Sequence, residues 1–284
     1  MAMTDDQWYE TEQGKAADSF VETAIALSIV LASAEVGAMV TDKLGPLFDW
    51  LMTNGESLGA PAEGIEDIRA SKRYLDMLKP ELAAAVRYSL IVIGACSAIE
   101  GFIEQFIKSR IRDEPSQLDG TDFDAVTAAQ RRSVSDPTDA EQVLDAQYRV
   151  IKGSPTKGLK RADPKPPPHD GFETMLSTVG RGGPTPPMVA RDVNNAYVLR
   201  NVWAHNAGYA DGNFTANAPA ALSVPVGALV TVTRGDAQRY LSVIMTYGMI
   251  VANRERNYHG LGPIPMTGKP GETEWGLAYH SLYT

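Results

Sequence analysis

Three polar side chains near residue 200 could act together on a phosphodiester. Arg200, Asn201 and His205 occur in the stretch LRNVWAHNAG, residues 199–208. A guanidinium binds phosphate oxygens with two parallel hydrogen bonds, and an imidazole exchanges protons near neutral pH. Cleaving RNA through its own 2′-hydroxyl needs those two groups and no metal. We therefore expect His205 to act as acid or base and Arg200 to hold the phosphate, with Asn201 orienting His205 or a phosphate oxygen.

The sequence around these residues predicts a helix over 188–205, ended by the glycines of 206–213. Asn201 and His205 are four residues apart and share a face, whereas Arg200 and His205 are about 140° apart. Arg200 and His205 can converge if the helix ends before His205, or across a symmetric dimer in which two copies of the segment face each other. The alternative is structural, because positive charge is also favoured at the C-terminus of a helix.

The amino-acid composition of the chain argues against several classes of function. The chain has 284 residues, of which 44% are hydrophobic, enough for one large domain or a domain with an extension. A net charge of −9 argues against a surface that binds nucleic acid as a whole, so an RNA site needs a local basic patch. The single cysteine, Cys96, excludes a disulfide framework, and the four histidines lack metal-ligand spacing on a helix face. We expect neither a metal nor a cofactor.

The sequence shows no export signal and no obvious membrane segment. Residues 1–14 are polar and acidic, without the basic start of a signal peptide. The longest apolar run, 23–34, has twelve residues and is too short to cross a bilayer. We therefore expect a cytoplasmic protein that does not contact a membrane.

The hydrophobic pattern predicts a mainly α-helical bundle with a small β-hairpin element. The helix over 81–112 is apolar nearly all round in its middle and should lie at the centre of the bundle. Glu100 lies in this stretch and would be costly to bury unpaired. The valine-rich segment 221–233, with Pro225-Val226-Gly227, predicts this element as a hairpin or two short strands. Further helices are expected over 15–52 with a break near 42–46, over 65–79, over 138–151 and over 236–256.

These elements predict three regions along the chain. They are an N-terminal helical extension over 1–80, a helical domain over 81–260, and a C-terminal tail over 261–284 that is either packed down by its aromatic residues or mobile. A Pro/Gly-rich insertion interrupts the helical domain at about 113–187, with a short helix expected over 171–179. The part of this region between Arg149 and Lys165 is basic, with six Lys or Arg and one Asp. Lys157, Lys160 and Arg161 are candidate RNA contacts, and a solvated loop is the alternative.

The motif and the order of the helices resemble the HEPN-domain ribonucleases. In that family an Arg, often followed by a polar residue, precedes a His by four to six residues, and Arg200-Asn201-x-x-x-His205 matches this pattern. Residues 88–103, with Glu100, resemble the long first helix of the family and its acidic residue. Residues 227–256 resemble its short β element and closing helix. The resemblance covers about 81–256, but neither 1–80 nor most of 113–187.

The resemblance implies a homodimer that cleaves RNA without a metal and leaves a 2′,3′-cyclic phosphate. It implies one composite cleft built from two copies of the motif, with Arg200, Asn201, His205 and Glu100 as site residues. Family members act as toxins, in antiviral defence or in RNA processing, so an antitoxin or another defence protein is an expected partner. Some members have lost catalysis, and the alternative is an inactive HEPN-like binding or assembly module. A subgroup controlled by nucleotide transfer carries Tyr two residues after the His; here that position is Ala207.

Overall fold

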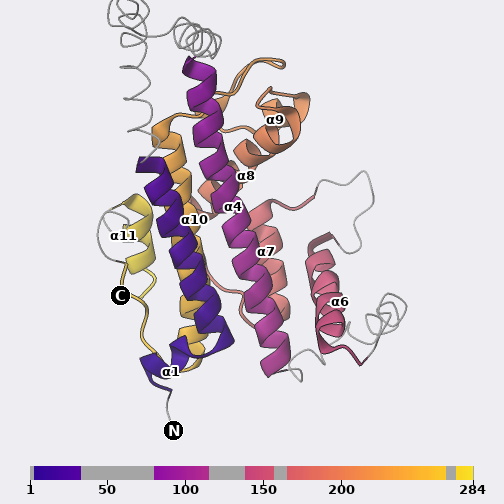
Figure 1. Ribbon diagram of the computed structural model, residues 1–284, viewed down its shortest axis with the longest axis vertical. Helices are drawn as coiled ribbons and strands as arrows, with labels where there is room; N and C mark the ends of the chain where they lie inside the picture. The colour runs from indigo at the N-terminus through magenta and orange to yellow at the C-terminus, as the bar shows by residue number, and fades with distance from the viewer. Residues whose placement is uncertain (1–2, 33–79, 115–137, 157–164, 267–272, 284) are drawn as a thin grey trace, which may run out of the picture. The chain divides into compact units, whose positions relative to one another are not determined.

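The computed structural model describes residues 3–32, 80–114, 138–156, 165–266 and 273–283 (Figure 1). These residues are mainly helical, as the sequence predicts, and they contain no β-strand. Besides a helical stretch over 12–32, the elements are α1 (Asp5–Tyr9), α4 (Pro80–Asp113), α6 (Ala140–Gly153), η3 (Ser154–Thr156), α7 (Pro168–Thr178), α8 (Pro187–Asn206), α9 (Gly212–Asn217), η4 (Ala220–Leu222), α10 (Arg234–Tyr258) and α11 (Glu274–His280).

The helices predicted from hydrophobic spacing occur within a few residues of their expected ends. α4, α8 and α10 extend their predicted ranges by one or two residues at both ends, and α6 begins and ends two residues later than predicted. α7 begins at Pro168, three residues before the expected start, because proline is well suited to the first position of a helix. The helix expected over 65–79 lies outside the described residues, as does the part of the 15–52 helix beyond residue 32.

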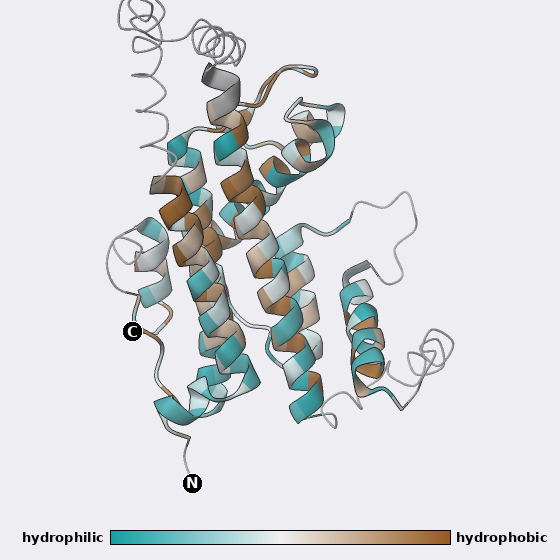
Figure 2. Ribbon diagram, in the orientation of Figure 1, coloured by the Kyte–Doolittle hydropathy of each residue, from teal (hydrophilic) through white to brown (hydrophobic). Residues whose placement is uncertain are grey.

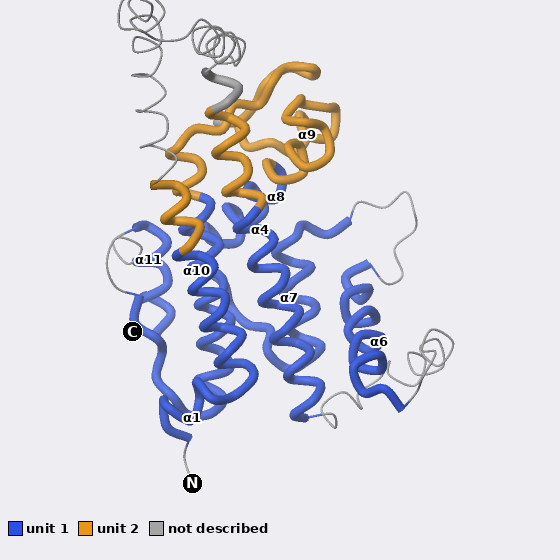
Figure 3. Tube along the Cα trace, viewed as in Figure 1, with its two compact units in different colours: residues 1–25, 94–198, 240–284 blue, residues 26–93, 199–239 orange. Residues whose placement is uncertain are grey.

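Contacts divide the chain into two compact units (Figure 3). Unit 1 comprises Met1–Ile25, Gly94–Val198 and Tyr240–Thr284. Unit 2 comprises Ala26–Ile93 and Leu199–Arg239. α4, α8 and α10 each contain a boundary between the units, so the motif at the end of α8 belongs to unit 2.

The core of unit 1 is built on the apolar side chains of α4. Ile99, Ile103 and Ile107 are fully buried at four-residue spacing, which places them on one face of the helix. Phe102 stacks on Phe20 of the 12–32 helix, with ring centroids 5.1 Å apart. Figure 2 shows that α4 is hydrophobic over much of its length and hydrophilic at its C-terminal end. These contacts make α4 the central helix of unit 1.

α4 also passes a simple test for a membrane-spanning helix. The segment Ala84–Asp113 is long and apolar enough to cross a bilayer by length and composition. Half of its most apolar window is buried inside the protein, and the core helix of a soluble protein passes the same test. The result is therefore weak evidence for a membrane span.

A close helix approach at Gly248 gives a direct test of this packing. A Cβ atom at Gly248 of α10 would lie 2.1 Å from the ring of Phe20, which is itself buried. Gly248→Ala should destabilise the protein by about 1–3 kcal/mol, despite the higher helix propensity of alanine, because the core is overpacked. Gly101 of α4 has no atom within 4 Å of such a Cβ and serves as the control. Gly101→Ala should stabilise by about 0.5–1 kcal/mol in urea unfolding; equal effects of both variants would contradict the packing.

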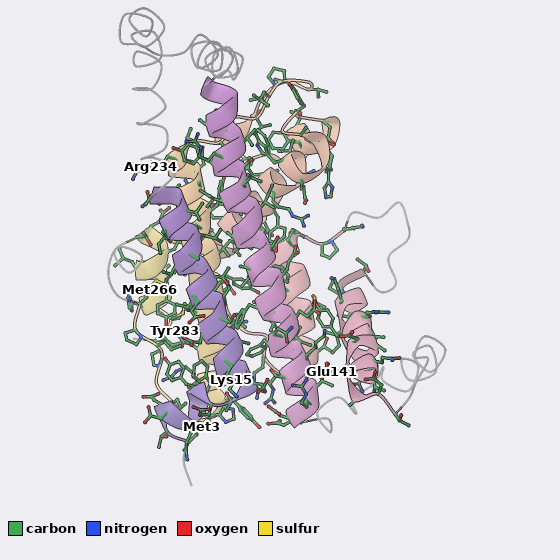
Figure 4. The ribbon with its side chains drawn as sticks, viewed as in Figure 1. Met3, Lys15, Glu141, Arg234, Met266 and Tyr283 are labelled. Atoms are coloured by element: carbon green, nitrogen blue, oxygen red, sulfur yellow. The ribbon has the colours of Figure 1, made fainter. Side chains whose placement is uncertain are left out.

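In the described part of the C-terminal tail, 261–266 and 273–283, two of its aromatic residues, Trp275 and Tyr279, are buried. Trp275 of α11 donates from Nε1 to Oδ2 of the buried Asp192, at 3.1 Å. The Tyr279 hydroxyl hydrogen bonds with the side chain of Asn253 and the carbonyl of Ile264. Burial raises the pKa of Tyr279 to about 12. Met266 and Tyr283, labelled in Figure 4, belong to the same C-terminal segment.

The β-hairpin predicted over 221–233 is wrong. This segment contains η4 and a turn in which the Ala228 amide donates to the Pro225 carbonyl, and Gly227 adopts a φ of 82°. The only antiparallel pairing in the described residues is an isolated bridge between Tyr209 and Leu229. The segment thus pairs with the chain that follows α8 instead of folding back on itself.

Candidate functional site

The motif occupies the last two turns of α8. Leu199 and Val202 are buried and fix this end of the helix against unit 2. Asn201, Ala204 and His205 are exposed, at the i, i+3 and i+4 positions that share one helix face. The sequence therefore places the imidazole of His205 on an exposed strip, where it can meet a ligand from solution.

Arg200 is turned toward this exposed strip. Its guanidinium is half-buried, and Nη1 donates a hydrogen bond of 3.1 Å to Oδ1 of Asn201. Asn201 lies one turn before His205 on the same face. Ala204, whose side chain is a single methyl group, lies between Arg200 and His205 around the helix. The structure thus joins Arg200 to Asn201, and Asn201 shares a helix face with His205.

The helix does not end before His205, which was one of the two expected routes to convergence. α8 continues to Asn206, so His205 remains in its last turn. The chain leaves the helix at Ala207 and Gly208, which have φ angles of 50° and 84°. Of the two expected routes, the one that remains is a symmetric dimer in which two copies of the segment face each other.

The turn after His205 is strongly constrained. Ala207 holds a left-handed conformation that costs an L-residue about 1–2 kcal/mol. The Gly208 amide donates to the Val202 carbonyl at 3.1 Å, and a Cβ at Gly208 would lie 2.8 Å from the ring of Trp203. Only glycine fits there. Local strain held by surrounding contacts is typical of functional turns.

Asn206 and Asp211 connect the end of α8 to the start of α9. Asn206 donates from Nδ2 to Oδ2 of Asp211 at 2.7 Å, and Asp211 caps α9 by accepting from the Phe214 amide at 2.7 Å. The Phe214 amide and then the Asn206 side chain hold the pKa of Asp211 below its usual range. A carboxylate that stays ionised is therefore fixed close to the motif in sequence and in space.

Glu100 lies on a different helix and in the other unit. It is a half-buried residue of α4 in unit 1, whereas Arg200, Asn201 and His205 belong to unit 2. Its charge acts on Tyr148 of α6, whose pKa is raised well above its usual value by burial first and then by Glu104 and Glu100. Lys157, Lys160 and Arg161, the expected RNA contacts, lie outside the described residues.

Sequence analysis missed a second group of charged residues, in unit 1. Of three consecutive charged residues of α10, Glu255 and Arg256 are buried and Arg254 is partly buried, and each contacts a different partner. Arg254 donates to both carboxylate oxygens of Glu173 at 3.0 Å. No local signal predicted this arrangement, because a run of charged residues normally faces solvent on at least one side.

Glu255 is the centre of this second group. It is fully buried, and it accepts hydrogen bonds from Arg110 at 3.1 Å, from Arg181 at 2.5 Å and from Nε2 of His259 at 3.0 Å. Arg110 also pairs with Glu114, and the ring of Tyr258 covers the Arg181 guanidinium at 3.7 Å. The two buried guanidinium charges are thus matched by two carboxylates. We interpret this group, the Glu255 cluster, as a structural network joining α4, α10 and the loop after α7.

No metal site accompanies either group in the part of the chain that the structure describes: no three His, Cys, Asp or Glu side chains are grouped there in a way that could hold an ion. The polar side chains at the end of α8 are the exposed imidazole of His205, the exposed amide of Asn201 and the half-buried guanidinium of Arg200. Comparison with known proteins gave no match to a protein-family model, a curated protein or a solved structure.

Proposed function

We propose that the protein is a HEPN-type, metal-independent endoribonuclease. The observation that carries the proposal is the position of Arg200, whose Nη1 lies 3.1 Å from Asn201 Oδ1 on the exposed strip that ends at His205. A phosphate bound by this guanidinium lies within reach of the imidazole one turn further on. The motif, its place at the end of a helix and the mainly helical fold agree with the family resemblance.

In the proposed reaction, His205 accepts the proton of a ribose 2′-hydroxyl. The 2′ oxygen attacks the adjacent phosphorus, the bond from phosphorus to the 5′ oxygen breaks, and a 2′,3′-cyclic phosphate forms. Arg200 stabilises the additional negative charge on the phosphate during this step. The leaving 5′ oxygen receives a proton from His205 of a second copy in the composite cleft of a homodimer. Neither a metal nor a redox partner takes part.

The proposal includes a cytoplasmic toxin-like or antiviral role, with an antitoxin or another defence protein as partner. The competing proposal is an inactive HEPN-like binding or assembly module. It is favoured by the net charge of −9, which weakens attraction to RNA. It is disfavoured by the exposed His205 and the orientation of Arg200, because a module without catalysis needs neither.

RNA cleavage in the presence of EDTA tests the proposal directly. The full chain should cleave an unstructured RNA and leave the matched DNA intact, because the reaction needs the 2′-hydroxyl. A single 2′-O-methyl group at the cut site should block cleavage there, and the 5′ fragment should end in a 2′,3′-cyclic phosphate. The rate per chain should fall on dilution below the dimer dissociation constant. Absence of cleavage on total cellular RNA and on synthetic RNAs, or loss of cleavage in EDTA, would overturn the proposal.

A further inference from the structure

Tyr209 presents an exposed aromatic ring directly beside the motif. Its side chain is 51% exposed, although a tyrosine normally buries part of its ring. The Tyr209 amide donates at 2.9 Å to the carbonyl of Asn206, the residue that follows His205. Ala207, the exposed residue between them, carries only a methyl group. The backbone of Tyr209 is therefore bound to the residue that follows His205, and its ring is exposed to solvent.

The backbone on both sides of Tyr209 is fixed by hydrogen bonds. The Val230 amide donates to the Gly208 carbonyl at 2.8 Å, and the Ala210 amide donates to the Ala228 carbonyl at 2.9 Å. Tyr209 itself forms the isolated bridge with Leu229. An exposed ring on a fixed backbone loses little conformational entropy when it binds a ligand, because only two side-chain torsions remain to be ordered.

The charge of the protein makes such a ring important for binding RNA. Lys and Arg total 26 against 35 Asp and Glu, and Asp211, two residues after Tyr209, carries a lowered pKa and stays ionised. Phosphate contacts alone then supply limited affinity. Stacking of a base on an aromatic ring contributes about 1–3 kcal/mol per base and does not depend on net charge.

We propose that Tyr209 stacks on an unpaired base next to the phosphate held by Arg200, so that the substrate is single-stranded RNA. The inference rests on the proposed function for the identity of the ligand. A base in a double helix is already stacked on both faces and cannot lie on the ring, whereas loops and single strands can. Tyr209 is then a positioning residue, which acts by holding the nucleotide whose 2′-hydroxyl faces His205.

Binding to an inactive variant tests this inference without relying on cleavage. In a His205→Ala background, fluorescence polarisation with a labelled, unstructured oligoribonucleotide measures affinity. Tyr209→Ala and Tyr209→Leu should each weaken binding about tenfold or more, whereas Tyr209→Phe should keep it, because the aromatic face carries the interaction. The loss should persist at high salt. Tyr9, a 44% exposed tyrosine of α1 in unit 1, provides the control, and Tyr9→Ala should leave affinity unchanged.

The outcomes separate this inference from the proposed function. In the active protein, Tyr209→Ala should raise KM for single-stranded RNA more than it lowers kcat, and a 4-thiouridine oligonucleotide should crosslink to the peptide that contains Tyr209. Cleavage by the wild type, with equal RNA affinity of the Tyr209→Ala, Leu and Phe variants, overturns the stacking role and leaves the nuclease proposal standing. RNA binding that depends on Tyr209, without any cleavage, supports the stacking role and overturns the nuclease proposal. A duplex bound as tightly as the single strand also overturns the inference.

Discussion

His205→Ala should abolish RNA cleavage, with a loss of about 10²–10⁴-fold in kcat, because proton transfer by a positioned imidazole contributes about that much. Arg200→Ala should lower kcat by about 10²–10³-fold, the usual effect of removing one group that stabilises developing charge. The side chain of His205 is exposed, so its loss should not alter stability. Single-turnover cleavage of a labelled RNA, with circular dichroism to verify folding, measures both effects.

Conservative variants distinguish chemistry from a structural role at the end of α8. Arg200→Lys keeps the charge but loses the bidentate contact to phosphate, so its activity should lie between those of Arg200→Ala and the wild type. His205→Lys keeps positive charge at the helix C-terminus, where the dipole favours it, but cannot exchange protons near neutral pH. If His205→Lys is as active as the wild type, or if both alanine variants are, the motif is only the end of a helix and the nuclease proposal fails.

Asn201 should have a smaller effect than its two neighbours. Its Oδ1 accepts the Arg200 Nη1 hydrogen bond, so Asn201 positions the guanidinium and does not itself transfer protons. Neither the orientation of Arg200 nor its hydrogen bond was predictable from spacing, since the 3.6-residue period separates Arg200 from His205 by about 140°. The side-chain conformation that joins Arg200 to Asn201 depends on rotamers, which the sequence pattern does not encode.

The helices were predictable because their signal is local. The four-residue spacing of Ile99, Ile103 and Ile107 predicts α4 without knowledge of any other part of the chain. The hairpin failed for the opposite reason. Val230 and Val232 are buried in alternation, as in a strand, but the backbone partner of the segment lies at 208–210, about twenty residues earlier. A valine-rich pattern predicts an extended segment, but it does not identify the part of the chain with which that segment pairs.

The Glu255 cluster was also beyond local prediction. Glu255 pairs with Arg110, 145 residues earlier in the chain, and with Arg181, 74 residues earlier. Charged residues are most often solvated, so Arg254, Glu255 and Arg256 gave no indication of burial by type alone. Only the tertiary structure shows that each of them is neutralised by a different element. Pairing between residues so far apart in the chain cannot be predicted from local sequence patterns.

Glu255→Gln should destabilise the protein by about 3–5 kcal/mol. The variant keeps the size of the side chain but leaves the guanidinium groups of Arg110 and Arg181, which are only 3% and 5% exposed, without their shared carboxylate. An uncompensated buried charge costs about this much, because it is removed from water without an opposite charge nearby. Urea unfolding of the full chain measures the change.

An exposed ion pair provides the matched control for this variant. Glu141 pairs with Arg112 at 2.9 Å, but its side chain is 72% exposed. Glu141→Gln should cost only about 0–1 kcal/mol, because solvent screens the pair. Arg181→Met, introduced together with Glu255→Gln, should recover part of the lost stability, since it removes one of the two buried cations.

The same variants decide whether the Glu255 cluster is structural or takes part in chemistry. His259 contacts Glu255 through Nε2 and is partly exposed, an arrangement that also orients catalytic histidines. If the cluster is structural, His259→Gln should leave RNA cleavage unchanged, and Glu255→Gln should reduce cleavage only in proportion to the fraction that unfolds. A folded Glu255→Gln variant without nuclease activity would contradict this and move the reaction from the end of α8 to the end of α10.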